Sequence, residues 1–217
     1  MINRIKEAIG AFVTDEKEEP NEPRLVIVDP SALQAAAQEE EPASHLIGLF
    51  AAVDEEKVAE LIHALLVVVE HEHKKEEDAK IPVEFYLSTY GGSADDMFAL
   101  YDVMRLVRED ITIRTVGVGK VMSAGVLLLA AGTKGERSIA KNCRIMIHSV
   151  MGGNQGDLHN MLNEMEAIED LQQMFVNCLV AETKMTKSQL KKMLDRKVNV
   201  YLSAEEAVEL GIADIII

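Results

Sequence analysis

The stretch GVGKVMSAG at residues 117–125, followed by the apolar run Val126–Ala131, decides how the surrounding chain folds. The residues before it, ITIRTV at 111–116, are mostly β-branched and alternate in polarity, which predicts a strand. The residues after it carry no charge and are rich in Leu and Ala, which predicts a buried helix over 124–131. Ser123 therefore lies where a strand passes into the first turn of an apolar helix.

Ser123 has two interpretations at this place. Peptide N–H groups at a helix start are unpaired, and the helix dipole there favours negative charge, which suits a nucleophilic serine. Serine is also a common N-cap residue, and capping is the more frequent use of a serine before a helix. The residues of this stretch leave both interpretations open.

The composition limits the class of protein. A chain of 217 residues builds one substantial core, and with 4% aromatic residues and no Trp that core is aliphatic and rich in Met. A net charge of −15 argues against binding nucleic acid or docking on an anionic membrane. No apolar run reaches the roughly 18 residues of a spanning helix, and the N-terminus lacks the apolar core of a signal peptide. We expect a cytoplasmic protein in which Cys143 and Cys178 stay reduced, with Cys143 in the core.

Residues 1–44 are predicted to be a peripheral leader or axial segment, partly flexible. Apolar side chains at helical spacing predict a short N-terminal helix over 2–12, and the acidic, Pro-bearing piece 14–23 predicts a linker or a removable leader. A short strand is expected at Leu25–Val28 and a flexible acidic piece at 38–42. The compact domain is expected over 45–217.

Strands and helices alternate along this domain, which predicts an α/β fold with a largely parallel sheet. The strands are expected at 46–52, 81–88, 111–118, 138–148, 198–202 and 213–217. The helices are expected at 54–69, 93–107, 124–131, 158–183, 185–194 and 203–210, with caps at Asp54, Ser93 and Ser203.

The charged tract Glu70–Lys80 is expected to be a solvated connection. It contains His71 and His73, but two histidines two positions apart face different ways on a helix, and no Cys lies nearby. We therefore expect no metal site there and no cofactor.

Three motifs with glycine near a helix start are excluded. A P-loop needs Gly where Arg114 stands and Ser or Thr where Val121 stands. A dinucleotide fingerprint needs its third Gly at Met122, and the nucleophile elbow needs its first Gly at Val121. Neither a nucleotide nor an α/β-hydrolase site is indicated.

A serine, a histidine and a later acidic residue remain as candidates for acyl transfer. A serine nucleophile must pass its proton to an imidazole, which a carboxylate holds in the correct tautomer. His148 is the one histidine among six that ends an expected core strand. Backbone donors for an oxyanion are expected at glycine-rich or helix-start positions, which Gly91-Gly92 and Ala124 offer.

Four segments of the chain together resemble the ClpP peptidase family, in order and in spacing, over about residues 45–217. These segments are YGGS at 90–93, GKVMSAG at 119–125, RIMIH at 144–148 followed by MGGNQG at 151–156, and YLSAEEAVELG at 201–211. The resemblance implies that Ser123 is the nucleophile, His148 the general base, and Asp195, six residues before Tyr201, the triad acid. It also implies that the amides of Gly92 and Ala124 form the oxyanion hole.

The resemblance further implies a fold and an assembly. The fold would be the ClpP/crotonase-like spiral of β-β-α units, with a protruding strand–helix handle at about 151–183 that joins two seven-membered rings into a tetradecamer. The active sites would face an enclosed chamber. An AAA+ unfoldase of the ClpX, ClpC or ClpA type would feed unfolded polypeptides into this chamber for ATP-dependent proteolysis by serine endopeptidase chemistry.

The chain departs from the family pattern near the serine. Lys120, Val121 and Met122 replace the usual Gln-Ala-Ala, and Leu194 stands where relatives often carry a charged group. These changes suggest a divergent member. The alternatives are a weakly active or silent subunit in rings mixed with other ClpP-type subunits, a crotonase-like acyl-CoA enzyme, and a phage prohead-type protease.

Overall fold

The structure of the protein is a computed structural model that describes residues 44–153, 155–195 and 198–217, and residues 42–217 form one compact unit. The strands are β1 (His45–Leu49), β2 (Val83–Thr89), β3 (Ile113–Met122), β4 (Ser138–Ile139), β5 (Arg144–Ile147), β6 (Val200–Leu202) and β7 (Ile215–Ile216). The helices are α3 (Glu55–Glu72), α4 (Ala94–Val107), α5 (Ala124–Ala130), α6 (Leu158–Glu182), α7 (Lys187–Leu194) and α8 (Ala204–Glu209), with a 3-10 helix at Glu77–Ala79. The expected helix at 2–12, linker at 14–23, strand at 25–28 and acidic piece at 38–42 lie outside the described residues.

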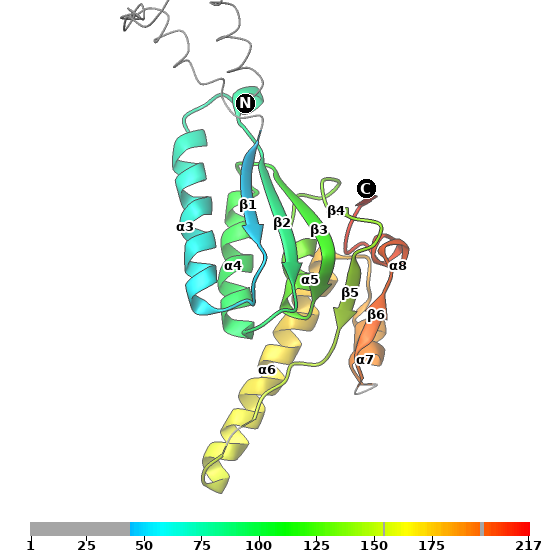
Figure 1. The fold of residues 1–217 in the computed structure, drawn as a ribbon. Coiled ribbons are helices and arrows are strands. Elements are labelled where there is room, and N and C mark those ends of the chain that lie inside the picture. Colours follow the sequence, from blue (N-terminus) through cyan, green and yellow to red (C-terminus); the bar gives the residue numbers. More distant parts are fainter. Residues whose placement is uncertain (1–43, 154, 196–197) are drawn as a thin grey trace, which may run out of the picture. The chain divides into compact units, whose positions relative to one another are not determined.

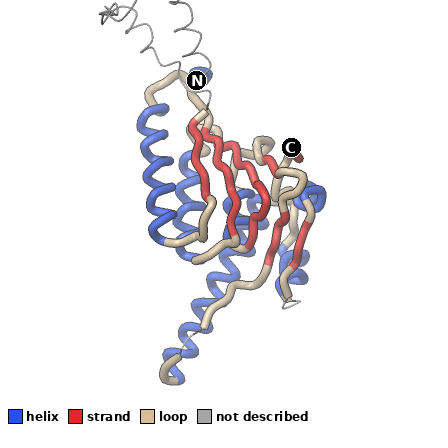
Figure 2. Tube along the Cα trace, in the orientation of Figure 1, coloured by secondary structure: helices blue, strands red, loops and turns tan. Residues whose placement is uncertain are grey.

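The predicted α/β class is confirmed, and the sheet is largely parallel. β1, β2 and β3 pair in sequence, and β3 then pairs with β4 along its first half and with β5 along its second. β4 pairs with β7 in parallel, whereas β6 pairs with β5 antiparallel. Helices α3, α4 and α5 lie on one side of β1–β3 (Figures 1 and 2). The carboxyl end of β3 is thus held between two neighbouring strands.

Local signals explain most of these elements. Along β2, every second side chain from Val83 to Thr89 is buried, as the alternating sequence predicts. Every residue of α5 is buried, which accounts for its unbroken apolar sequence. The expected caps form: Asp54 and Ser93 accept amide hydrogen bonds from their helices, and Ser203 makes a capping box with Glu206.

The largest differences from the expected strands occur where tertiary pairing overrides local sequence. β3 continues to Met122, four residues past its expected end, since its last residues pair with β5 from Lys120–Arg144 to Met122–Met146. The expected strand at 138–148 is two strands separated by a turn, in which the Cys143 amide donates to the Ala140 carbonyl at 2.8 Å. Each half therefore reaches a different part of β3.

Helix α6 extends well beyond the sheet (Figure 1). Its second half packs into the core through side chains such as Phe175 and Leu179, whereas Leu158 in its first turn is 68% exposed. The segment before α6 contacts the helix at Val150, whose amide donates to Gln172 Oε1 at 2.7 Å. The resemblance implies a strand in this handle, but the described residues of this segment form none, because it has no neighbouring strand within one chain.

The tract Glu70–Lys80 differs from the expected solvated connection at one residue. Helix α3 runs to Glu72, whose side chain is fully buried. Burial would raise the pKa of Glu72, but hydrogen bonds from the Ile81 amide and from His71 and His45 lower that pKa to about 2. The prediction of solvent exposure is wrong at Glu72. The residues around Glu72 gave no sign of its burial, because its partner His45 lies 27 residues earlier in the sequence.

The other expectations about bulk chemistry concern the cysteines and the membrane. Cys143 and Cys178 are both free thiols, and Cys143 is buried in the core as predicted. Burial raises the pKa of the Cys143 thiol to about 11, so this thiol is unreactive at neutral pH. Among the described helices, none has the length and apolarity needed to cross a membrane.

Candidate active site

Ser123 is held in a strained conformation at the junction of β3 and α5. Its φ of 53° makes it the one residue other than glycine with positive φ in the described part of the chain. Its amide donates to the Met146 carbonyl at 2.8 Å, which fixes the junction to β5. Although Ser123 stands at the N-cap position, its side chain makes no capping hydrogen bond. The capping interpretation therefore does not account for this serine.

The hydroxyl of Ser123 instead meets His148. Its Oγ lies 2.8 Å from the Nε2 atom of His148. The register of β3 and β5 explains this contact, because Met122, the last residue of β3, pairs with Met146, and β5 ends one residue later at Ile147. Since the hydroxyl donates when Nε2 carries no proton, this geometry suits transfer of the serine proton to the imidazole.

A double-glycine turn passes beside Ser123. Gly91 has a φ of 94°, and a Cβ atom there would lie 2.6 Å from the Cβ of Ser123. A Cβ atom on Gly92 would lie 2.0 Å from the Val53 carbonyl oxygen. The Gly91 amide donates to Thr89 Oγ1 at 3.0 Å, which holds the turn. Only glycine fits at both positions, and the close approach brings backbone amides next to the serine.

The amides of Gly92 and Ala124 are available to a ligand. Ala124 is the first residue of α5, so its N–H has no partner within the helix. Within the described residues, neither of these two amides donates a hydrogen bond. Free amides beside a nucleophile are the groups that stabilise an oxyanion.

Ser123 and His148 open into a cavity of about 370 Å³. The cavity combines the double-glycine turn and the serine–histidine pair with apolar side chains from α4, α6 and the handle segment. These apolar side chains are Met97, Val150, Met151 and Phe175. An apolar cavity with a few convergent polar groups is typical of a site that binds a side chain or a small ligand.

Asp195 is the one predicted site residue that the structure does not bring to the others. It is the exposed C-cap residue of α7, and over the described residues no hydrogen bond joins its carboxylate to His148. Its neighbour is close, however: Ser149 Oγ donates to the Leu194 carbonyl at 3.0 Å. The backbone at Asp195 is therefore held near the end of β5 while its side chain is turned outward.

Two of the residues that depart from the family pattern before Ser123, Val121 and Lys120, lie in different environments. Val121 is fully buried in the core, so its bulk does not enter the cavity. Lys120 lies over the ring of Tyr90, with Nζ 4.6 Å from the ring centroid. Because Tyr90 lines the cavity and is 71% exposed, the charge of Lys120 is placed at the rim.

Sequence reasoning missed several contacts that build the site. The Thr89 hydroxyl holds the double-glycine turn, and Phe175 reaches the cavity from a helix 52 residues after Ser123. The helical spacing of Phe175 predicts a core position only. No local signal in the sequence identifies either residue as part of a site.

A serine next to an imidazole and to free backbone amides is the set of groups that enzymes with a serine nucleophile use to transfer acyl groups. The family model of the Clp protease matches residues 43–217, and the chain belongs to the Clp protease family. Proteins of this family are serine peptidases.

Gly91→Ala is expected to reduce activity by about 100-fold, since a shift of about 1 Å in reacting groups costs that much. The added methyl group would collide with Ser123 and lie 2.8 Å from the Met122 carbonyl oxygen, so the junction must move. Peptide hydrolysis by the purified full chain measures the effect. Gly135→Ala is the control, because Gly135 also has positive φ but its Cβ would meet nothing within 4 Å. Equal losses in both variants would contradict this account.

Proposed function

We propose that this protein is the serine endopeptidase subunit of a self-compartmentalised protease that cleaves unfolded polypeptides. The observation that carries the proposal is the 2.8 Å contact between Ser123 Oγ and His148 Nε2 at the mouth of an apolar cavity. The family match supports peptidase chemistry over the acyl-CoA alternative.

The proposed reaction follows from the positions of these groups. Ser123 gives its proton to His148 Nε2 as Oγ attacks the peptide carbonyl, and the Gly92 and Ala124 amides stabilise the negative oxygen. His148 then donates the proton to the leaving amine, and the acyl group stays on Ser123. His148 then takes a proton from a water molecule as the water oxygen attacks the acyl carbonyl, and it returns that proton to Ser123 Oγ as the ester bond breaks and the carboxylic acid leaves.

We assign Asp195 the role of orienting His148 after a change in its side-chain position. The hydrogen bond from Ser149 to Leu194 keeps the backbone of Asp195 near the histidine strand. The exposed side chain of Asp195 would have to turn inward to reach the imidazole. Contacts between subunits are the expected cause of that change.

Asp195→Asn tests this assignment. We expect a loss of about 10⁴-fold in kcat, because an amide does not hold the imidazole in the productive tautomer. The assay is peptide cleavage across a range of pH by assembled protein. Asp102→Asn is the control, since Asp102 is an exposed residue of α4 outside the proposed site and outside the exposed half of α6. Unchanged activity in Asp195→Asn would exclude Asp195 from the mechanism.

The proposed assembly is a double ring, loaded by an AAA+ unfoldase. The first half of α6 and the segment before it expose apolar side chains that a solvated helix would not carry: Met151, Leu158, Met161, Leu162 and Met165. Contact with a second copy would bury them, which is the usual role of such patches. Negative-stain images and peptide cleavage on the same sample test this, and a monomeric sample with full activity would contradict it.

One observation favours a second candidate, a silent or weakly active subunit of mixed rings. Asp195 is exposed and does not contact His148 in this chain, so a different ClpP-type subunit beside it would be needed to complete the site. Purified protein alone would then assemble without cleaving peptides, and addition of the other subunit would start cleavage. A homogeneous and active double ring would exclude this candidate.

A further inference from the structure

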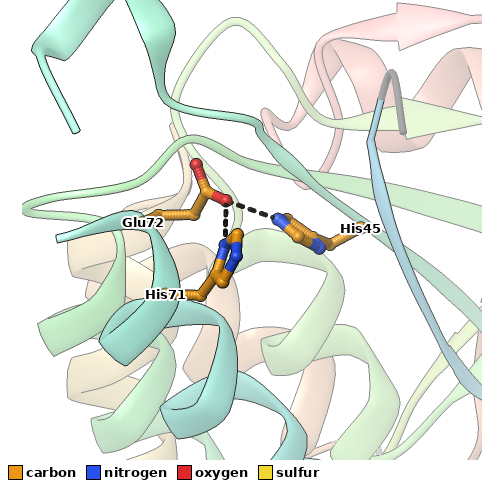
Figure 3. Close-up of side chains that lie close together, drawn as sticks. All are labelled: His45, His71 and Glu72. Atoms are coloured by element: carbon orange, nitrogen blue, oxygen red, sulfur yellow. Dashed lines mark hydrogen bonds and ion pairs between the residues drawn. The ribbon is translucent and has the colours of Figure 1, made fainter. Parts of the chain in front are cut away.

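Three side chains far from the sequence motifs of the active site converge on a single point. His45 comes from the start of β1, and His71 and Glu72 come from the last turn of α3 (Figure 3). One oxygen of Glu72, Oε1, lies 3.0 Å from His45 Nε2 and 2.9 Å from His71 Nδ1. The sequence expectation of no metal site compared His71 with His73, which instead contacts Asp110. The partner that matters is His45, 26 residues before His71.

The three atoms have the chemistry and the spacing of a zinc ligand set. Two imidazole nitrogens and one carboxylate oxygen bind Zn²⁺ in many proteins, with a water as the fourth ligand. Ligand atoms about 2.1 Å from a tetrahedral zinc ion lie about 3.4 Å apart. The three atoms here lie within 4.8 Å of one another. The two nitrogen–oxygen pairs, now at 3.0 and 2.9 Å, would have to separate by about 0.4–0.5 Å to accept the ion.

The carboxylate is fixed by an outer contact, as in built metal sites. Glu72 is fully buried, and its second oxygen, Oε2, accepts a hydrogen bond from the Ile81 amide at 2.8 Å. Such outer hydrogen bonds orient a ligand and keep Oε1 directed at the two histidines. The His71 side chain is 63% exposed, so an ion can enter and a water can complete its shell.

We propose that His45, His71 and Glu72 bind a divalent transition-metal ion, and that Zn²⁺ fits the set best. The ion would tie the beginning of the sheet, at His45 of β1, to the end of α3. The site is separate from Ser123 and His148, and its ligands belong to none of the elements that line the active-site cavity.

Lys75 competes with the ion for the same oxygen. Its Nζ lies 3.1 Å from Glu72 Oε1, and its side chain is 18% exposed. An ammonium group there supplies positive charge to the buried carboxylate and opposes a second cation. Removing that charge, as in Lys75→Met, is therefore expected to tighten metal binding, whereas a purely structural ion cluster would bind no metal in either form.

Titration of the full chain with Zn²⁺, after removal of any affinity tag, tests the proposal. Calorimetry is expected to give one ion per chain, and Co²⁺ is expected to give the visible absorption of a tetrahedral complex. His45→Asn and His71→Asn should each weaken binding by more than about tenfold, the lower end of what even outer-shell changes cost. His63→Asn, on α3, and His73→Asn, just after α3, are the matched controls. Neither should change the affinity for Zn²⁺.

The outcomes separate the two interpretations of the cluster. Loss of binding in the His45 and His71 variants with a gain in Lys75→Met supports the site. Absence of Zn²⁺ binding, or binding that all four histidine variants retain, overturns it. The two histidine substitutions leave the Glu72–Ile81 contact in place, so they remain informative even if a Glu72→Gln variant fails to fold. Peptidase activity is not a readout, so failure here leaves the proposed function untouched.

Discussion

Replacing Ser123 with alanine is expected to abolish both peptide cleavage and labelling by a fluorophosphonate probe. The variant keeps the strand–helix junction but removes the oxygen that lies 2.8 Å from His148. Loss of a serine nucleophile costs about 10⁶-fold in kcat in a well-studied serine protease, which is below the detection limit of most peptide assays. Steady-state cleavage of a short peptide and gel-based probe labelling are the two measurements.

The control for this experiment is another serine on the same chain. Ser188 is exposed on α7, so Ser188→Ala should be labelled and should cleave peptides as the parent does. Labelling that persists in Ser123→Ala would place the nucleophile elsewhere. Images of both variants show whether assembly is intact, which separates a chemical loss from a failure to assemble.

Replacing Glu182 with alanine is expected to produce the largest loss of stability. The side chain is almost fully buried. It accepts hydrogen bonds from Arg108 at 2.7 and 3.0 Å and from Tyr101 at 2.9 Å, and it forms an ion pair with Lys134 at 2.8 Å. Removing one member leaves buried groups without a partner, which costs about 3–5 kcal/mol. Urea unfolding at fixed protein concentration measures the change.

A surface ion pair supplies the matched control. Glu136 binds Arg114 at 3.0 Å, with both side chains more than 40% exposed. Glu136→Ala should cost less than about 1 kcal/mol, because water screens and replaces such a pair. Similar losses for Glu136→Ala and Glu182→Ala would show that burial of the network contributes nothing.

The Glu182 network also predicts how stability depends on pH. Burial would raise the pKa of Glu182, but hydrogen bonds from Arg108 and Lys134 lower it to about 2, below the ordinary value of 4.5. The contribution of the ionised carboxylate is therefore complete above about pH 4.5 and is lost as the pH falls towards 2. The stability difference between the parent and Glu182→Gln should shrink over this interval and stay constant above it.

The sequence predicted the elements whose signals are local. The alternation of β2, the apolar run of α5 and the caps at Asp54, Ser93 and Ser203 each depend on neighbours within a few residues. The end of β3 could not be predicted in this way, because its last residues form a strand only through pairing with β5. The break between β4 and β5 has the same origin.

The candidate site divides along the same line. Local pattern alone favoured a capping role for Ser123. Residue types and the strand-end position suggested His148, 25 residues later, as its partner, and the family resemblance then assigned the two roles. The structure shows this pair in contact but leaves Asp195 turned outward. The convergence of His45 on Glu72 crosses 27 residues and belongs to no motif. Contacts of this kind depend on how strands and helices pack, which a periodic pattern does not contain.

The positive φ of Ser123 means that the stability of the fold and the presence of the serine hydroxyl place opposite demands on this position. A backbone conformation of this kind costs about 1–3 kcal/mol in a residue other than glycine, so the chain folds in spite of its serine. A lineage that no longer needed catalysis would gain stability by exchanging this residue for glycine and would keep the same architecture. Serine at position 123 is thus less favourable for the backbone than glycine, and the exchange that would relieve this strain is also the one that would remove the hydroxyl facing His148.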